Sequence, residues 1–539
     1  MKPRSLTLFA TAVALTACVA ASWRSGVSAQ GQLGNRADDG VAGIGSITWG
    51  TCSDETLAEF GAECGFLSVP RDYSRPTGPK VKLALSRVRH TVPDDQYQGI
   101  MLVNPGGPGA SGLIFAILGA FVPNGVGEAY DWIGFDPRGV GASIPSLHCN
   151  PTYSAGPRPP YDPFTRHIEV AWLSRVTTYA DDCGRAGSRL LDHVKTIDSV
   201  RDMNAIRVAL GASTINYYGY SYGTYLGQVF ATQYPTRVRR MVLDSNVDPR
   251  RVWYDANLDQ DIGFETVLQL FFKWVARYDN VYGLGSSRRV VEAKYYSALD
   301  TLAANARGEL GAAEWSDAFI IAGYLQASWP DVAAGFAAYV NDDDPGPALD
   351  LFHGSVDTTD DNGYAMYLAT ECTEGFWPSM WSVWRRDNRR TAREAPYLTW
   401  GNAWYNAPCA FWPAESSRPI EVRDRKVPPI LLLGETLDAA TPFRGSVEVR
   451  HRFEASSLIA TKGGTTHANS LFGGNACVDD RVAAYLADGS TPKRVHGAGP
   501  DVVCPATPEP VPVGAATAVR TQTLSVDAKR RLQEKMFRR

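Results

Sequence analysis

The sequence predicts an α/β protein whose mostly parallel, doubly wound sheet is interrupted by a helical insertion. Three observations carry this prediction. Short apolar runs alternate with helix-like segments, as expected for buried parallel strands joined by helices. The alternation lapses between about residues 250 and 410, where the sequence is helical and rich in tryptophan. The segment 219–223 reads Gly-Tyr-Ser-Tyr-Gly and links a strand-like run to a helix-like run.

Seven apolar runs are expected to form the strands of this sheet. Several are short and continuous, which is typical of strands with both faces buried. Helical stretches such as 199–210 and 446–453 lie between them. The expected strands are Val81–Val88, Gly99–Val103, Tyr130–Phe135, Ile215–Tyr218, Arg240–Asp244, Pro429–Leu433 and Ser457–Thr461.

The length and charge of the chain exclude several classes of protein. With 539 residues, it is too long for one simple domain and about right for a large α/β core with an insertion. Charged residues make up 20% and hydrophobic residues 44%, so the chain is globular rather than disordered. The formal charge is −4, and no basic block suggests nucleic acid binding. The basic end, residues 529–539, is expected to be a solvated helical tail.

Residues 1–29 are expected to be an export signal. Lys2 and Arg4 form its charged start, and Leu6–Leu15 is an apolar core too short to span a bilayer as a mature helix. Two processing sites remain open. Val27-Ser28-Ala29 fits cleavage after small residues, whereas the segment ending at Cys18 resembles a bacterial lipobox in which Cys18 carries lipid. Either site places the mature protein outside the cytoplasm, secreted or in the cell envelope, with a lipid at Cys18 as the only membrane contact expected.

The cysteine count supports export. Nine cysteines are present, and setting Cys18 aside leaves eight, an even number that indicates four disulfides in an exported chain. Pairing in sequential order closes short loops and is the arrangement expected. No metal is predicted, because the sequence contains no C-x-x-C or H-x-x-x-H pair for zinc. The expected disulfides are Cys52–Cys64, Cys149–Cys183, Cys372–Cys409 and Cys477–Cys504.

These features divide the chain into five parts. The α/β core is expected from residues 47–250 and 411–505, on either side of a helical insertion at 251–410. The insertion is expected to act as a lid, since loops at the carboxyl ends of parallel strands carry the ligand sites of such sheets. The alternative is a structural appendage with buried aromatic residues. The export signal precedes the core, and residues 506–539 are expected to form a peripheral tail.

Ser221, at the apex of the 219–223 turn, is expected to be a nucleophile. A turn this sharp between strand and helix needs flanking glycines, because a Cβ there would clash, and it presents the serine hydroxyl outward. A serine hydroxyl is a weak nucleophile at neutral pH, so it needs a base and a third group that orients the base. The alternative is an incidental glycine-rich turn.

The base is expected late in the chain, because enzymes with this elbow carry the order Ser, Asp or Glu, His. His467 follows the last expected strand, on a loop from which it can reach the elbow, and is the expected base. A structural loop histidine is the alternative. Two other late histidines are less suitable, since His451 lies inside a polar helical run and His496 lies near the tail.

The acid should lie on the loop after the preceding strand. Asp438 follows the strand at 429–433 and is the expected acid. Glu435 in the same loop is a rival. Asp244, at the end of an earlier strand, is a second rival.

Charge that builds on a substrate carbonyl oxygen must be met by backbone N–H groups. One donor should be Tyr222, directly after the nucleophile. The other is expected from the glycine-rich segment Asn104–Gly112, whose glycines let the backbone approach a substrate closely. Pro108 has no N–H, so Gly107 is the expected donor and Gly106 the alternative. A plain turn is the competing interpretation.

Together these segments resemble the exported tripeptidyl aminopeptidase branch of the α/β-hydrolase superfamily, which is related to the prolyl aminopeptidases. The resemblance runs from about residue 49 to 505 and implies an α/β-hydrolase fold with an inserted helical lid. The combination of motifs is far more specific than the elbow alone. The matching segments are Gly219–Thr224, Asn104–Gly109, Gly134–Gly141, Leu437-Asp438 with Thr441-Pro442, and an early region with Trp49, Cys52, Cys64 and Val69–Tyr73.

The resemblance implies an exported serine hydrolase of the aminopeptidase type, without cofactor. Such an enzyme releases tripeptides, other short peptides or single residues from free N-termini through an acyl-enzyme. A carboxylesterase with the same triad is the first alternative, and a non-catalytic binding protein on this scaffold is the second.

Recognition of a protonated amine requires carboxylates near the lid, which form charge-assisted hydrogen bonds. Glu371 and Glu374, on either side of Cys372, are the candidates, and solvated surface glutamates are the alternative interpretation. Asp136 and Arg138 are expected to form a structural ion pair below the site.

Overall fold

The structure is a computed structural model that describes residues 41–187, 189–512 and 524–537. The expected export signal at 1–29, including Cys18, lies outside the described residues. Among the described helices, none combines the length and the apolar character that crossing a bilayer requires.

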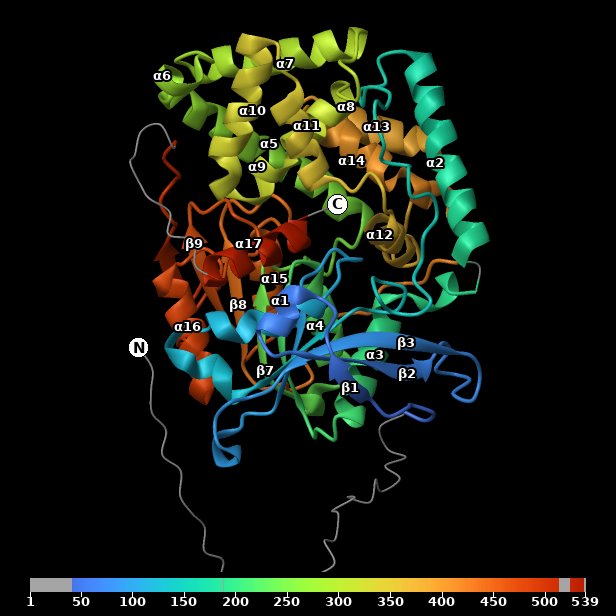
Figure 1. Cartoon of the computed structure of the whole chain (residues 1–539), viewed down its shortest axis with the longest axis vertical. Coiled ribbons are helices and arrows are strands. Elements are labelled where there is room, and N and C mark those ends of the chain that lie inside the picture. Colours follow the sequence, from blue (N-terminus) through green and yellow to red (C-terminus); the bar gives the residue numbers. More distant parts are fainter. Residues whose placement is uncertain (1–40, 188, 513–523, 538–539) are drawn as a thin grey trace, which may run out of the picture. The chain divides into compact units, whose positions relative to one another are not determined.

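The described residues form a ten-stranded sheet in the order β1-β2-β3-β5-β4-β6-β7-β8-β9-β10 (Figure 1). From β5 to β10 in this order, neighbouring strands are parallel, whereas β1, β2 and β3 form an antiparallel edge that joins β5. This arrangement confirms the predicted α/β class with a mostly parallel sheet. The strands are β1 (Thr48–Thr51), β2 (Glu63–Pro70), β3 (Lys80–Val88), β4 (Ile100–Asn104), β5 (Asp131–Phe135), β6 (Ile215–Tyr220), β7 (Val238–Asp244), β8 (Ile430–Glu435), β9 (Ser457–Lys462) and β10 (Val502–Pro505).

Each face of the sheet has its own apolar core. Successive side chains of a strand point to opposite faces, so Leu102 and Val103 of β4 belong to different cores, as do Tyr217 and Tyr218 of β6. Both faces are therefore covered, as in a doubly wound sheet. The helices that flank the strands are α1 (Glu55–Glu59), α3 (Thr196–Ala209), α4 (Tyr222–Gln233), α15 (Arg444–Arg452), α16 (Ala476–Asp488) and α17 (Leu524–Phe537).

Each of the seven expected strands is present, and its ends lie within two residues of the expected ones. Three strands were not expected: β1, β2 and β10. β1 and β10 lie at the two edges of the sheet and are largely exposed, and only part of β2 is buried. None of the three therefore carries the continuous apolar run by which a buried strand is recognised.

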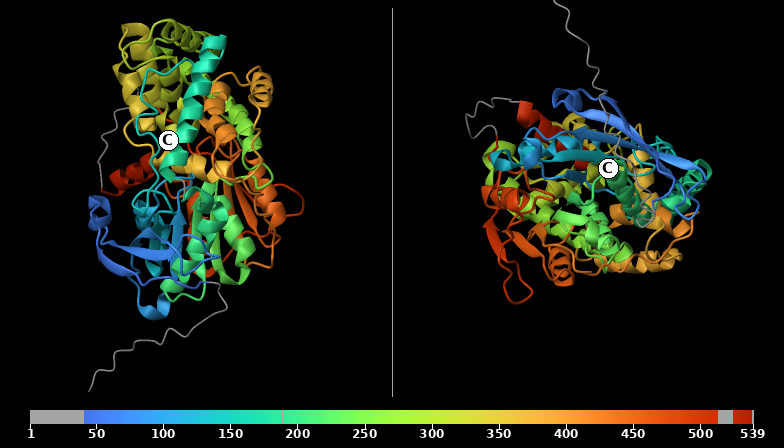
Figure 2. Two further views of the ribbon diagram at one scale, coloured as in Figure 1. Left: turned by 90° about the vertical axis from the view of Figure 1, so that its right-hand side faces the viewer. Right: turned by 90° about the horizontal axis from the view of Figure 1, so that it is seen from below.

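Between β7 and β8 the described residues form helices and no strand, as the sequence predicts for 251–410. In Figure 1 and in the left view of Figure 2, these helices gather at one end of the sheet. The helices between residues 254 and 355 share an aromatic core in which Trp274, Trp315 and Trp329 are buried. The helices are α5 (Tyr254–Arg277), α6 (Asp279–Tyr282), α7 (Arg288–Ala304), α8 (Ala312–Ala318), α9 (Ile320–Tyr324), α10 (Trp329–Asp342), α11 (Gly346–Ser355), α12 (Asn362–Cys372), α13 (Trp381–Thr391) and α14 (Thr399–Asn406).

A segment that precedes residue 250 in the sequence also belongs to this helical layer. The guanidinium of Arg158 lies 2.7 Å from Glu314 and 2.7 Å from Asp317, both on α8. Trp172, on α2 (Arg166–Gly187), stacks on Trp404 of α14 with ring centroids 5.7 Å apart. The segment around α2 is thus part of the helical layer in space, which the division of the sequence at residue 250 did not anticipate.

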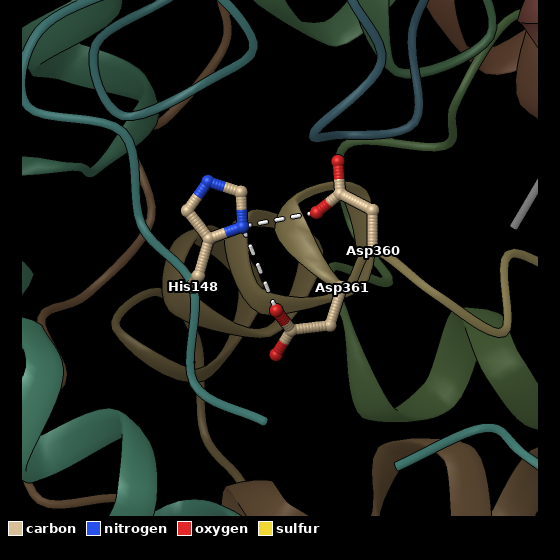
Figure 3. Close-up of side chains that lie close together, drawn as sticks. All are labelled: His148, Asp360 and Asp361. Carbon is tan, nitrogen blue, oxygen red and sulfur yellow. Dashed lines mark ion pairs between the residues drawn. The ribbon is translucent and has the colours of Figure 1, made fainter. Parts of the chain in front are cut away.

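A further link fastens the start of α12 to the segment that follows β5 (Figure 3). His148 Nδ1 lies 2.9 Å from Asp360 and 3.7 Å from Asp361. The second oxygen of Asp361 accepts hydrogen bonds from the N–H groups of Cys149 and Asn150. The ligand atoms of His148, Asp360 and Asp361 lie within 4.8 Å of one another, a spacing that a divalent cation could also use. The ion pairs of His148 and the hydrogen bonds to Asp361 tie the two segments together, so we assign the group as a clamp on α12.

The structure joins eight cysteines in four disulfides, in sequential order. Cys52–Cys64 connects the residue after β1 to β2, and Cys477–Cys504 connects α16 to β10, so each edge of the sheet is covalently held. Cys149–Cys183 joins the segment after β5 to α2. Cys372–Cys409 joins the end of α12 to the short helix η8 (Ala407–Phe411).

The expected ion pair between Asp136 and Arg138 is wrong, because each residue has a different buried partner. Arg138 pairs with Asp202 of α3 at 2.6 Å. Asp136 accepts hydrogen bonds from the Ser111 hydroxyl at 2.6 Å and from the N–H of Gly112 at 2.9 Å. Asp136 therefore fixes the glycine-rich segment that follows β4, while Arg138 anchors α3.

Candidate active site

Ser221 lies between β6 and α4 with φ 54° and ψ −126°, a conformation that few residues other than glycine adopt. The glycines around it make the turn possible. A Cβ on Gly219 would lie 2.5 Å from the carbonyl oxygen of Gly223, and a Cβ on Gly223 would lie 2.5 Å from that of Asn104. The N–H of Ser221 donates to the carbonyl of Asp244 at 3.1 Å, which ties the turn to the neighbouring strand. This is the strand-turn-helix geometry of a nucleophile elbow.

Ser221 lines a cavity between the carboxyl ends of the strands and the helical insertion. β4 has β5 on one side and β6 on the other, so the direction of strand order reverses at β4, which is where ligands bind in such sheets. The glycine-rich segment follows β4 and Ser221 follows β6. The lining includes Gly107, Ser221, Tyr222 and His467 from the core, and Trp253, Asn257, Tyr324, Tyr367, Glu371, Asn402 and Tyr405 from the insertion and its approach.

His467 and Asp438 meet below this cavity. The Nδ1 atom of His467 lies 3.0 and 2.9 Å from the two carboxylate oxygens of Asp438, and both side chains are buried. Asp438 also accepts hydrogen bonds from the N–H groups of Ala440 and Thr441 and from the Thr441 hydroxyl, which fix the carboxylate. Since Nδ1 faces Asp438, the Nε2 atom is the ring nitrogen left for chemistry in the cavity.

The two rival acids have other partners. Glu435 accepts hydrogen bonds from the Asn469 side chain and the N–H of Thr466, both at 2.6 Å, and burial raises the pKa of Glu435 to about 8. Asp244 accepts from the N–H and hydroxyl of Ser470, and burial raises its pKa as well. Both carboxylates hold the loop that carries His467. The rival bases His451 and His496 are exposed and do not line the cavity.

The glycine-rich segment approaches the elbow closely. Gly106 has φ +107°, and a Cβ there would lie 2.7 Å from the Cβ of Ser221 and 3.0 Å from the N of Tyr222. The N–H of Gly106 donates to the side chain of Asn104 at 3.0 Å, so it already has an acceptor. Gly107 and Tyr222 both line the cavity. The geometry thus favours Gly107 over Gly106 as an oxyanion donor beside Tyr222.

The sequence of the chain is similar to those of known proteins. A family model described as "TAP-like protein" matches residues 395–504. Tripeptidyl aminopeptidase from Streptomyces lividans is 39% identical over 484 residues, which cover 86% of this chain and 88% of that protein. The chain belongs to the tripeptidyl aminopeptidase family of α/β-hydrolases.

Other members of this family carry different names. Serine protease Hip1 of Mycobacterium tuberculosis is 33% identical over 488 residues, covering 83% of this chain and 89% of that protein. Carboxylesterase B of the same organism is 32% identical over 471 residues, covering 83% of this chain and 88% of that protein. The tripeptidyl aminopeptidase family therefore includes proteins named as peptidases and as an esterase.

The two candidate amine-binding residues, Glu371 and Glu374, differ in position: only Glu371 lines the cavity. Glu371 lines the cavity and is buried, and its Oε2 accepts no hydrogen bond from the residues that the structure describes. Burial raises the pKa of Glu371 well above its ordinary value. Glu374 is absent from the cavity lining and accepts hydrogen bonds from the N–H and hydroxyl of Thr196, while burial raises its pKa to about 7.

Helix α17 (Leu524–Phe537) borders the cavity, although the sequence predicts a peripheral tail for residues 506–539. α17 buries Ala528, Leu532, Met536 and Phe537, and the last two line the cavity. The expectation of a peripheral tail is therefore wrong for 524–537. The spacing of 528, 532 and 536 places these side chains on one face of a helix, a signal that was available in the sequence but was outweighed by the basic residues between them.

Proposed function

We propose that this chain is a serine aminopeptidase that releases short peptides, tripeptides foremost, from free N-termini. One observation carries the proposal: a strained serine, the histidine of a buried Asp–His pair and a carboxylate oxygen without a hydrogen-bond donor all border one cavity. These are Ser221, Asp438 with His467, and Glu371. The 39% identity to a protein named tripeptidyl aminopeptidase supports the same activity.

In this proposal Ser221 is the nucleophile. Its Oγ attacks the carbonyl carbon of the scissile amide while His467 Nε2 takes the hydroxyl proton. His467 then delivers this proton to the departing nitrogen as the C–N bond breaks, which leaves an acyl-enzyme. Water attacks the acyl carbon, His467 again moves the proton, and Ser221 is regenerated. Asp438 orients His467 and stabilises its positive charge during both steps.

The N–H groups of Tyr222 and Gly107 are proposed to meet the oxyanion. Tyr222 begins α4, so its N–H is one of those that no helical carbonyl uses. Gly107 follows Gly106, which holds the loop against Ser221. Donors placed in advance by the backbone stabilise the developing charge without reorganisation, and losing one such donor typically costs about 10²–10³ in rate.

Glu371 is proposed to bind the protonated amine of the substrate. Tyr367 and Asn257 hydrogen-bond to the Glu371 side chain, but its Oε2 is buried without a donor, which is costly, and an incoming ammonium would supply a donor to that oxygen and a positive charge beside it. Glu374, held by Thr196, is assigned a supporting role at the end of α12 rather than contact with the amine. The helical insertion is accordingly a lid in function, since it brings Glu371 over the site.

A carboxylesterase is the second candidate. The observation in its favour is the 32% identity to a relative named Carboxylesterase B. Ester and amide hydrolysis use the same nucleophile, base and oxyanion donors, so recognition of the amine is what separates the two activities. A binding protein without catalysis is the weakest candidate, because it would have no use for a strained serine beside an Asp–His pair.

Export is proposed from two observations. The chain begins with a charged and then apolar segment typical of an export signal, and four disulfides are present in the structure. Whether the mature chain is released or held by lipid at Cys18 is decided by mass spectrometry of the mature N-terminus from cells.

The activity is tested with paired peptides that differ only in a free or acetylated N-terminus. Products are identified by mass spectrometry, and Ser221→Ala is the control. We expect cleavage of the free peptides with release of short N-terminal fragments, and labelling by a fluorophosphonate probe in the wild type alone. Equal cleavage of both peptides would contradict recognition of a free amine, and cleavage of simple esters with neither peptide cut would favour the esterase candidate. Equal labelling of the Ser221→Ala variant would exclude Ser221 as nucleophile.

A further inference from the structure

Helix α17 is fastened to the core by several independent contacts. Ala528, Leu532, Met536 and Phe537 join the apolar core on one face of the sheet. The ammonium of Lys529 lies 5.2 Å from the ring centre of Phe121, and Arg531 donates to the Thr56 hydroxyl. In Figure 1, α17 crosses the region between the strands and the helical insertion. The helix is thus a docked part of the site.

The end of α17 lies beside His467. The ring centroid of Phe537 is 6.2 Å from that of His467 and 5.5 Å from that of Tyr324. Tyr324 and His467 have centroids 5.7 Å apart, and the N–H of His467 donates to the carbonyl of Tyr324 at 2.8 Å. The three rings form one cluster, and all three residues line the cavity together with Met536.

The proposed reaction places one part of the substrate, the leaving group, next to this cluster. His467 must hand its proton to the nitrogen that leaves, so that nitrogen approaches His467 within hydrogen-bonding distance. The first residue of the departing peptide is attached to this nitrogen. Its side chain therefore has to be accommodated beside His467, where Phe537 and Met536 supply the wall.

We propose that Phe537, with Met536, determines specificity by limiting the size of the first residue of the departing peptide. Small residues fit beside His467, whereas large aromatic residues collide with the Phe537 ring. The inference rests on the proposed function, in that the substrate loses a group from the His467 side; the peptide test below also uses release of a tripeptide, which mass spectrometry of the products checks. The amine of the substrate is handled by a different element, α12, so the two selections are separable.

The test uses two peptides that share an N-terminal tripeptide and differ in the fourth residue, glycine or tryptophan. The measured quantity is the ratio of kcat/KM for the tryptophan peptide to that for the glycine peptide. Phe537→Ala should raise this ratio about tenfold, as expected when a pocket wall is cut back. Phe537→Trp should lower it. Lys535→Ala, on the exposed side of the same helix, is the matched control and should leave the ratio within about twofold.

Two results would overturn the inference. One is a Phe537→Ala ratio equal to that of Lys535→Ala. The other is an equal fall of both kcat/KM values, which would mean that Phe537 supports His467 and selects nothing. If Phe537→Ala does not fold, Phe537→Trp decides, and an unchanged ratio in that variant counts against the inference.

Failure of the proposed function would be visible separately, as a wild type that cleaves neither peptide. In that case esters of one acid with methanol and with a bulky aromatic alcohol replace the peptides. The alcohol leaves beside His467 as the amine does, so Phe537→Ala should again favour the bulky leaving group. An unchanged ester ratio would overturn the role of Phe537 whatever the natural substrate.

Discussion

Gly109 and Gly363 bring the glycine-rich segment and the helical insertion into direct contact. A Cβ on Gly109 would lie 2.3 Å from the carbonyl oxygen of Gly363 and 3.0 Å from the N of Tyr367, both on α12. The loop proposed to bind the oxyanion and the helix proposed to bind the amine therefore share one contact. A side chain that displaces the loop at Gly109 should therefore also displace the start of α12. The first prediction tests this contact.

Gly109→Ala should reduce kcat/KM by about 10² or more, the cost of misplacing an oxyanion donor. Gly109 has φ +100°, so alanine is strained there besides colliding with Gly363. Gly363→Ala is the matched control, because its Cβ would meet only the carbonyl oxygen of Gly109, at 3.9 Å. We expect this variant to keep activity within about twofold. Equal losses in both variants would show that the contact tolerates no side chain on either side and would remove the specific role of the loop.

Asp438→Asn should lower kcat by about 10⁴ while the protein stays folded, because an amide presents the wrong hydrogen-bonding groups to His467 Nδ1. The control is Glu435→Gln in the same loop. Burial raises the pKa of Glu435 to about 8, so this carboxyl is mostly protonated at pH 7 and glutamine resembles it. We expect a loss of less than about tenfold for Glu435→Gln. Steady-state kinetics on one substrate distinguish the two variants, and a larger loss at Glu435 would make it the acid.

Glu435 should also make stability depend on pH. Its pKa is about 8 in the folded chain against 4.5 for the free side chain, so between these values the unfolded chain binds fewer protons than the folded chain. This carboxyl therefore lowers the free energy of unfolding progressively as pH rises from about 4.5 to 8, and not beyond. Urea unfolding of wild type and Glu435→Gln at pH 5, 6.5 and 8, with disulfides intact, measures the effect. Parallel profiles would contradict it.

Glu371→Gln should raise KM for free-amine peptides by about 10- to 100-fold, the loss expected for a charge-assisted hydrogen bond. It should leave kcat/KM for simple esters nearly unchanged. Because burial raises the pKa of Glu371, KM of the wild type should fall as pH rises, until the substrate amine loses its proton near pH about 8. The variant should lack the acidic limb of this profile.

Glu374→Gln is the comparison for this prediction. Glu374 is buried outside the cavity and bonded to Thr196, so its change should lower the melting temperature without selective loss on free-amine peptides. A selective amine defect in Glu374→Gln, with none in Glu371→Gln, would reverse the assignment of the two residues.

Much of the fold was predictable because its central strands are buried on both faces. Strands such as β4 and β8 are continuous apolar runs, and the turn at Ser221 needs glycines that are visible in the sequence. The edge strands β1 and β10 were not predictable in this way. They are short and exposed, and disulfides hold them in place. Their sequences therefore lack the apolar run that marks a buried strand.

The catalytic residues of the candidate site were predictable from the sequence, whereas the residues that line its cavity were not. Chain order singled out Asp438 and His467, since each follows a recognisable strand. The contribution of α17 depends on contacts between Phe537 and residues more than 60 positions away, such as His467. Likewise, the packing of Arg158 on α8 joins segments that no local pattern connects.

The order of the disulfides has a consequence for how the chain is oxidised. Each of the four bonds joins a cysteine to the next one along the sequence, from Cys52–Cys64 to Cys477–Cys504, with separations of 12 to 37 residues. Consider a chain that enters an oxidising compartment from its N-terminal end. The first cysteine of each pair is then followed directly by its native partner, before any cysteine of a later pair enters. Such a chain can acquire its native bonds in one pass, so its maturation should require an oxidant and little help from a disulfide isomerase.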